Sequence, residues 1–213
     1  MRPTLLLAGA LAGPFYVAIG TVEALVREGF DIRVQPLSVL ANGPGGWVHS
    51  AMMITTGLLI VLGAVALRDA MPRVSRIGLI VFGLGVTAGG VMIADPVAGF
   101  PPGTPTTPPE TISWHGLGHF AAGGIGFLGL IVAALVLANR FRRDGEPGWA
   151  WFSLVTGVLY LGSFLGLGAG GGRMVPNLAF TVAVVLGWAW TTLLMLRVRT
   201  TTTDTRTARV PAT

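Results

Sequence analysis

The feature that most limits how this chain can fold is an apolar run from Trp114 to Ala138. About 20 consecutive apolar residues are enough to cross the hydrocarbon core of a bilayer as a helix. Other apolar runs alternate with short polar segments, so hydrophobic residues make up 52% of the chain and charged residues only 11%. Soluble domains carry charge on about a quarter of their residues. The sequence therefore predicts an all-α, polytopic membrane protein.

Turn-rich or charged segments divide the chain into six expected spans. They cover residues 5–26, 47–67, 77–94, 114–139, 149–168 and 177–196. The first run imitates a signal peptide, but its apolar part exceeds the roughly 7 to 15 residues usual there, which favours a retained helix. The six-helix transmembrane domain then occupies residues 1–197. The Thr- and Arg-rich segment 198–213 has no apolar period, and we expect a disordered cytoplasmic tail there.

Small residues recur four apart in three of these spans. The chain has 32 glycines, and small residues let helices approach closely where lipid gives no hydrophobic drive for association. We therefore expect helix contacts at three pairs. They are Gly9 and Gly13, Gly85 and Gly89, and Gly162 and Gly166.

The arginines indicate the orientation. Six spans place both termini on one side, and all fourteen basic residues are arginine. Only Arg27, Arg33 and Arg173 fall on the other side, which leaves eleven on the side of the termini. Cytoplasmic loops are enriched in basic residues, so we predict cytoplasmic termini and the cell inner (plasma) membrane. The basic residues are spread through short loops, which argues against nucleic acid as a partner.

Polar side chains gather near the outer ends of the predicted helices, and we expect them to form one outward-facing pocket. Its expected members are Asp95, His115, His119 and Arg173, with Glu23 and His49 as second-line members. Ionisable groups at membrane depth are costly and usually face the bundle interior or water. Asp95 follows a helix C-terminus, where the dipole disfavours its charge, so we expect Arg173 or a histidine beside it.

His115 and His119 are four residues apart, so their side chains share one face of a helix. Three interpretations of this pair are open. The rings can be interfacial groups bonded to backbone or water, or a proton-handling cluster. They can also be ligands of a divalent metal completed by Asp95, His49 or Glu23. The glutamate of the HExxH metalloprotease motif is absent, and the sequence identifies no cofactor.

Ser38 is the only serine near this cluster that we consider as a candidate nucleophile. A turn or a helix cap accounts for it, and no GxSxG motif of a serine hydrolase occurs. The segment GAGGG at 168–172 lacks the GK[ST] ending of a phosphate-binding loop, and we interpret it as a turn. Arg173 beside it remains suited to a lipid phosphate.

Four segments together resemble a known family. They are QPLSVLANGPGGW at 35–47, DPVAGFP at 95–101, WHGLGH at 114–119 and GGGR at 170–173. The chain resembles, over residues 5–195, the bacterial six-helix membrane family catalogued as domain of unknown function 998. That family has no established activity, so the resemblance implies six spans. The residues to which it draws attention, without giving them a role, are Ser38, Asp95, His115 and Arg173.

Our leading prediction is a membrane protein that binds a lipid headgroup or a small ligand from the outer side in the polar pocket. The first alternative is a membrane-embedded, metal-assisted hydrolase that acts at the outer leaflet. The second alternative is a transporter, which requires polar groups through the midplane, where two of the helices offer only Thr87 and Thr181. Membrane lipids are the expected partners in each case.

Overall fold

The computed structural model describes residues 2–107, 110–170 and 173–207, with side chains as far as Thr201. Six α-helices and two short 3-10 helices make up the fold. They are α1 (Arg2–Val26), η1 (Leu37–Ala41), α2 (Gly46–Ala66), η2 (Leu67–Asp69), α3 (Arg73–Val91), α4 (Trp114–Arg143), α5 (Pro147–Ala169) and α6 (Met174–Thr207). Each of the six α-helices is long and apolar enough to cross a membrane. The predicted all-α, six-span architecture is confirmed.

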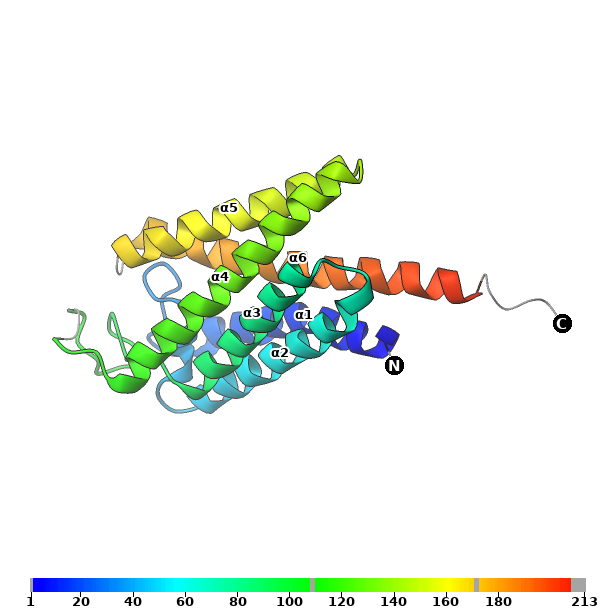
Figure 1. Cartoon of the computed structure of the whole chain (residues 1–213). Coiled ribbons are helices and arrows are strands. Elements are labelled where there is room, and N and C mark those ends of the chain that lie inside the picture. The colour runs from blue at the N-terminus through cyan, green and yellow to red at the C-terminus, as the bar shows by residue number, and fades with distance from the viewer. Residues whose placement is uncertain (1, 108–109, 171–172, 208–213) are drawn as a thin grey trace.

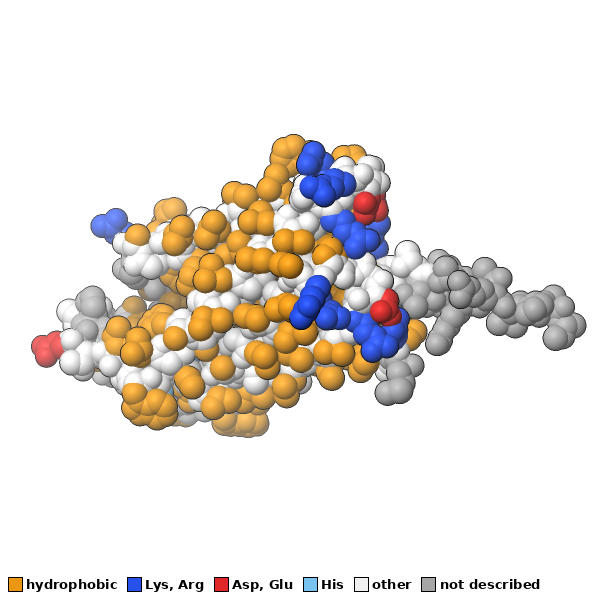
Figure 2. Space-filling view, viewed as in Figure 1, with side chains coloured by type: hydrophobic (Ala, Val, Ile, Leu, Met, Phe, Trp, Pro, Cys, Tyr) orange, Lys and Arg blue, Asp and Glu red, His pale blue; other side chains and the backbone are white. Residues whose placement is uncertain are grey.

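The helices close into a ring. Each α-helix packs against the next along the chain, and α6 returns to pack against α1. The start of α1 and the end of α6 lie at the same end of the bundle, on the right in Figure 1. We call this the terminal end, and we call the opposite end, where α1 ends and α4 begins, the loop end. Figure 2 shows arginines gathered at the terminal end and apolar side chains along the flank.

Side-chain packing is tightest toward the terminal end. Fully buried side chains there come from five of the helices. They include Leu6, Ile60, Leu79, Leu137 and Leu194. Because these positions belong to the half of each helix nearest the termini, the solid part of the core lies in that half of the ring.

Two of the three glycine pairs lie where helices touch. A methyl group on Gly9 would come within 2.9 Å of the α2 backbone, and one on Gly85 within 2.6 Å of a carbonyl oxygen of α4. Real Cβ atoms do not approach that closely, so only glycine allows these contacts. Gly162 and Gly166 of α5 differ, because no described atom lies within 4 Å of such a methyl group. The contact predicted at this third pair is wrong.

The last helix extends further than expected. We predicted a helix over 177–196 and a disordered tail from residue 198, whereas α6 continues to Thr207. A helix that is already formed adds each further residue at little cost. The helical conformation gives the hydroxyls of Thr200 and Thr201 a partner, because both donate to the Arg197 carbonyl, at 2.8 and 3.3 Å. The rest of the predicted tail, residues 208–213, lies outside the described residues.

Candidate functional site

The two second-line residues are hydrogen-bonded to each other between α1 and α2. His49 is fully buried and Glu23 is 6% exposed. Nδ1 of His49 lies 2.8 Å from Oε2 of Glu23, and Nη1 of Arg27 lies 3.6 Å from the other carboxylate oxygen. A buried carboxylate is tolerated when charged or polar groups pair with it. The structure therefore brings these residues together at the loop end, where they join two helices.

Arg27 extends this pair into the neighbouring loops. Its guanidinium donates to the carbonyl oxygens of Leu40 at 2.9 Å and Asn42 at 2.5 Å, and it lies 5.3 Å from the centre of the Phe100 ring. The side-chain amide of Asn42 donates in turn to the carbonyl of Ala94 at 3.0 Å. The segment between α1 and α2 is thereby fixed onto the segment between α3 and α4.

His115 and His119 bind the free carbonyl groups at the end of α3. The last carbonyls of a helix have no partner within it. Nδ1 of His119 lies 2.9 Å from the Gly89 oxygen and 2.8 Å from the Met92 oxygen, and Nδ1 of His115 lies 2.8 Å from the Ile93 oxygen. A carbonyl oxygen only accepts, so Nδ1 carries the proton in both rings. Of the three interpretations, these contacts support bonding to the backbone, and they stabilise an end of α3 that comes earlier than predicted.

Asp95 pairs with the start of α4. Its Oδ1 accepts from the Ser113 hydroxyl at 2.5 Å and its Oδ2 from the Ser113 N–H at 2.8 Å. Nδ1 of His115 lies 3.8 Å from Oδ1, so the expected histidine is beside this carboxylate. Burial raises the pKa of Asp95, but the Ser113 hydrogen bonds and the charge of His115 outweigh it, and the pKa lies below its ordinary value. The part played by Ser113, which also caps α4, was not predicted.

Arg173 does not join these groups. It is exposed, and among the described residues its side chain makes no ion pair or hydrogen bond. Asn177, one turn further along α6, is buried and donates to the carbonyls of Ile32 at 2.8 Å and Gln35 at 3.0 Å. The six predicted residues thus lie at one end of the bundle in separate groups rather than around a single pocket. Ligand binding by any of them stays a prediction.

The geometry gives no support to the two alternative functions. Among the described residues, no three His, Asp or Glu side chains lie close enough to hold one metal ion. A transporter needs polar groups at mid-depth. The threonines in the middle of α2, α5 and α6, Thr56, Thr156 and Thr191, donate instead to carbonyls of their own helices.

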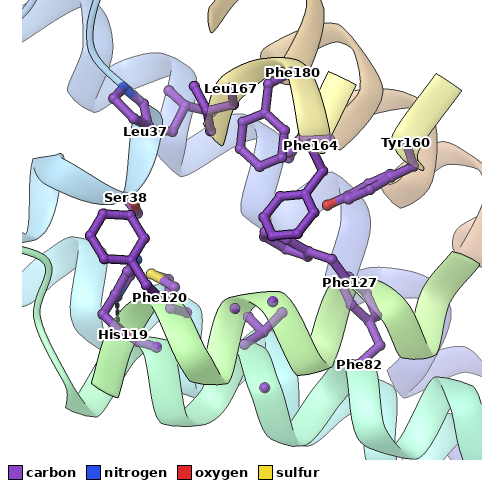
Figure 3. A pocket seen from close by; sticks show the side chains of 18 of the residues that line it. Leu37, Ser38, Phe82, His119, Phe120, Phe127, Tyr160, Phe164, Leu167 and Phe180 are labelled. Atoms are coloured by element: carbon purple, nitrogen blue, oxygen red, sulfur yellow. Dashed lines mark hydrogen bonds between the residues drawn. The ribbon is translucent and has the colours of Figure 1, made fainter. Parts of the chain in front are cut away.

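A cavity lies inside the ring of helices, on the loop side of the solid core. It has about 840 Å³ of space free of protein atoms, part of it open to the surroundings. All six helices and the segment 36–38 contribute to its wall, which includes eight aromatic rings (Figure 3). The rings are Tyr16, Phe82, Phe120, Phe127, Tyr160, Phe164, Phe180 and Trp188.

Few polar groups face this cavity. Its described lining includes Ser38, Thr181, His119 and the two tyrosines Tyr16 and Tyr160 but no Asp, Glu or Arg. Thr181 donates to a carbonyl of its own helix. Nδ1 of His119 is occupied by the end of α3, which leaves Nε2 as a hydrogen-bond acceptor. His119 is therefore the one predicted site residue that lines the cavity, and Figure 3 shows it near Ser38 and Phe120.

We infer that the cavity opens sideways between α4 and α5, because Phe120 of α4 lines it and is 57% exposed. These helices lie close near the terminal end, where a methyl group on Gly157 would lie 3.0 Å from Leu135, and they diverge toward the loop end (Figure 1). There a methyl group on Gly124 would meet only the Phe164 ring, at 3.5 Å. Within the fully described α5, no residue after Tyr160 is buried. Phe120, 57% exposed, stands at the edge of the opening.

The aromatic wall was missed by sequence reasoning, although a signal was present. Tyr160 and Phe164 on α5 are four apart, and Phe180 and Trp188 on α6 are eight apart, so each pair lies on one face of its helix. In the structure both faces turn inward and their rings touch, with 6.3 Å between the centres of Phe164 and Phe180.

The chain belongs to the family described as protein of unknown function (DUF998), whose model matches residues 10–197. The resemblance inferred from the four short segments is confirmed. No curated protein and no solved structure matches the chain. The family and the six apolar helices make it an integral membrane protein with multiple spans.

Proposed function

We propose that this protein binds the apolar part of a membrane lipid in its central cavity. The observation that carries the proposal is the cavity lined by eight aromatic rings, which reaches the surface of the bundle at Phe120. That opening lies on the flank of the bundle, where the bilayer surrounds it, so a lipid can enter without leaving the membrane. A cavity with apolar walls is a poor site for water. Lipid is the apolar molecule present at high concentration at this opening.

His119 is the predicted site residue that we place beside the lipid. Its Nε2 accepts a hydrogen bond from a ligand hydroxyl near the loop end. Asp95, His115, Glu23 and His49 support the loops around the cavity in this proposal. Arg173, exposed at the loop end, remains a candidate contact for a lipid phosphate.

Two glycine substitutions test lipid binding. Gly124→Leu places a side chain in the cavity opening, beside the Phe164 ring. Gly162→Leu adds the same side chain to α5 where no described atom lies within 4 Å. We expect purification in mild detergent to retain stoichiometric lipid in the parent and in Gly162→Leu, and to lose it in Gly124→Leu. Native mass spectrometry gives the lipid count, and the melting temperature of each variant shows that it is folded.

Two outcomes of this experiment would contradict the proposed lipid binding. A parent that carries no stoichiometric lipid contradicts the proposal. Equal retention by folded Gly124→Leu and Gly162→Leu places the lipid elsewhere on the protein and also contradicts it.

We further propose that the terminal end faces the cytoplasm and the loop end the outside of the plasma membrane. The excess of arginines at the terminal end supports this orientation. The chain has no cysteine, so single cysteines report topology directly. A membrane-impermeant maleimide should label Thr107→Cys in intact cells and Asp144→Cys only after the membrane is opened. The reverse labelling would overturn the orientation.

A further inference from the structure

We propose that the innermost part of the cavity is a site for the planar, oxygen-bearing ring of a lipid of the quinone class. This inference rests on the proposed lipid binding and names the chemistry of the lipid. It comes from the arrangement of two tyrosines and the rings around them.

The chain has two tyrosines, and both line the cavity. Tyr16 on α1 is 7% exposed and Tyr160 on α5 is 2% exposed. Neither hydroxyl has a hydrogen-bond partner among the described residues, although the O–H of a tyrosine usually finds one when its ring is buried. In Figure 3 the Tyr160 hydroxyl points into the cavity, toward Phe127 and Phe164. A ligand with acceptor atoms at this depth would satisfy these donors.

The two tyrosines lie at the same depth, on two sides of α6. Tyr16 stacks on Trp188, with 4.8 Å between ring centres and 27° between ring planes. A methyl group on Gly187, the residue before Trp188, would lie 2.8 Å from Cε2 of Tyr160. Two phenol rings, each with a hydroxyl, therefore line this level of the cavity from α1 and α5. They suit a ring that carries two acceptor oxygens on opposite edges.

The walls at this depth suit a flat ligand. Phe82 lies 5.3 Å from Trp188 and Phe127 lies 5.3 Å from Tyr160, measured between ring centres. Rings that pack on one another in this way leave their other faces and edges for contact with a further planar ring. A quinone ring adds a π-system to this group and offers its two carbonyl oxygens to the tyrosine hydroxyls.

The absence of charged side chains from the described lining disfavours anionic lipid head groups in the innermost part of the cavity. A phosphate or a carboxylate would lose its hydration without a cation to pair with, since no Arg is found in the described lining. A plain acyl chain would leave both tyrosine hydroxyls unsatisfied. A quinone is uncharged, and its long apolar tail can leave through the opening between α4 and α5, past Leu167 and Phe120.

Binding of decylubiquinone to the purified full-length protein in detergent tests the inference. Trp188 lines the cavity, so quenching of tryptophan fluorescence reports occupancy, and equilibrium dialysis measures the amount bound. Dodecylbenzene, which has a ring and a chain but no oxygen, is the matched ligand. Tyr16→Phe and Tyr160→Phe remove one hydroxyl each and keep the ring. Thr55→Val, which removes an exposed hydroxyl outside the cavity, is the control variant.

We expect saturable decylubiquinone binding that dodecylbenzene competes with only weakly. Each tyrosine variant should raise the Kd about five- to tenfold, as expected for one lost hydrogen bond, and Thr55→Val should leave it unchanged. Equal affinity for the two ligands, or tyrosine variants that bind like the parent, overturns the quinone site while lipid binding stands. If neither ligand binds and the parent retains no lipid, the proposed function falls as well.

Discussion

The substitution Glu23→Gln tests the buried ion pair at the loop end. Glu23 is 6% exposed and its carboxylate faces His49 at 2.8 Å and Arg27 at 3.6 Å. The amide keeps the size of the side chain and one acceptor oxygen but removes the negative charge. Arg27 then stays largely buried, with a side chain 14% exposed, and no anionic partner balances its positive charge.

The size of the effect follows from burial. Breaking a buried ion pair by removing one partner costs about 3 to 5 kcal/mol, and we expect about 3 kcal/mol because glutamine can still accept from His49. For a chain of 150 to 250 residues, 1 kcal/mol changes the melting temperature by roughly 2 to 4 °C. The melting temperature of Glu23→Gln in detergent, followed by circular dichroism, should fall by roughly 6 to 12 °C.

The exposed pair between Asp31 and Arg33 provides the matched control. Their side chains also make charge-assisted hydrogen bonds, at 2.8 and 2.9 Å, and the pKa of Asp31 is lowered by the Arg33 hydrogen bonds. The Arg33 side chain is however 66% exposed, and exposed pairs contribute little. Asp31→Asn should leave the melting temperature nearly unchanged. If Glu23→Gln shifts it no more than Asp31→Asn does, our account of the buried pair is wrong.

Three further predictions concern stability. The pKa of Asp95 is lowered in the folded state, so its contribution to the free energy of unfolding is complete at neutral pH. That contribution is lost as the pH falls through the lowered pKa, below about pH 4. Acidification should therefore lower the melting temperature of the parent more than that of Asp95→Asn. Gly85→Ala should lower the melting temperature, because the methyl group would lie 2.6 Å from the α4 backbone. Gly162→Ala, with open space there, should keep or raise it, and equal shifts would contradict the packing. Ser153→Ala removes the acceptor at 3.0 Å from Nε1 of fully buried Trp190. It should lower the free energy of unfolding, measured by chemical denaturation, by about 1 to 3 kcal/mol.

The six spans were predictable because crossing a bilayer requires only length and apolar composition. The ends of the helices were less predictable because distant residues determine them. α3 ends where His115 and His119 of α4 bind its last carbonyls. Nothing local to residues 91–94 carries that information.

The positions of the polar groups along the bundle axis were predictable, but their partners were not. Alternating spans fix which end a residue reaches. They do not fix the rotation of a helix about its own axis when the helix is apolar on all sides. Arg173 and Asn177 illustrate this, since both lie at the loop end, yet Arg173 is exposed and Asn177 is buried. The aromatic wall escaped prediction for the same reason, because Phe120 and Phe127 are alike in sequence but only Phe120 is largely exposed.

The polar groups at the loop end hold in place the segment that covers the cavity. Ser38 lies in the short segment that covers the loop end of the cavity. Arg27 holds that segment from one side through two carbonyls, and Asn177 holds it from α6 through two more. The ion pair at Glu23 therefore supports the cover without facing a ligand. It follows that Glu23→Gln should weaken lipid retention only in proportion to the stability it removes, whereas Gly124→Leu should abolish retention in a protein of nearly parental stability. If Glu23→Gln loses lipid at temperatures where it is fully folded, the buried pair contacts the ligand and this division of tasks is wrong.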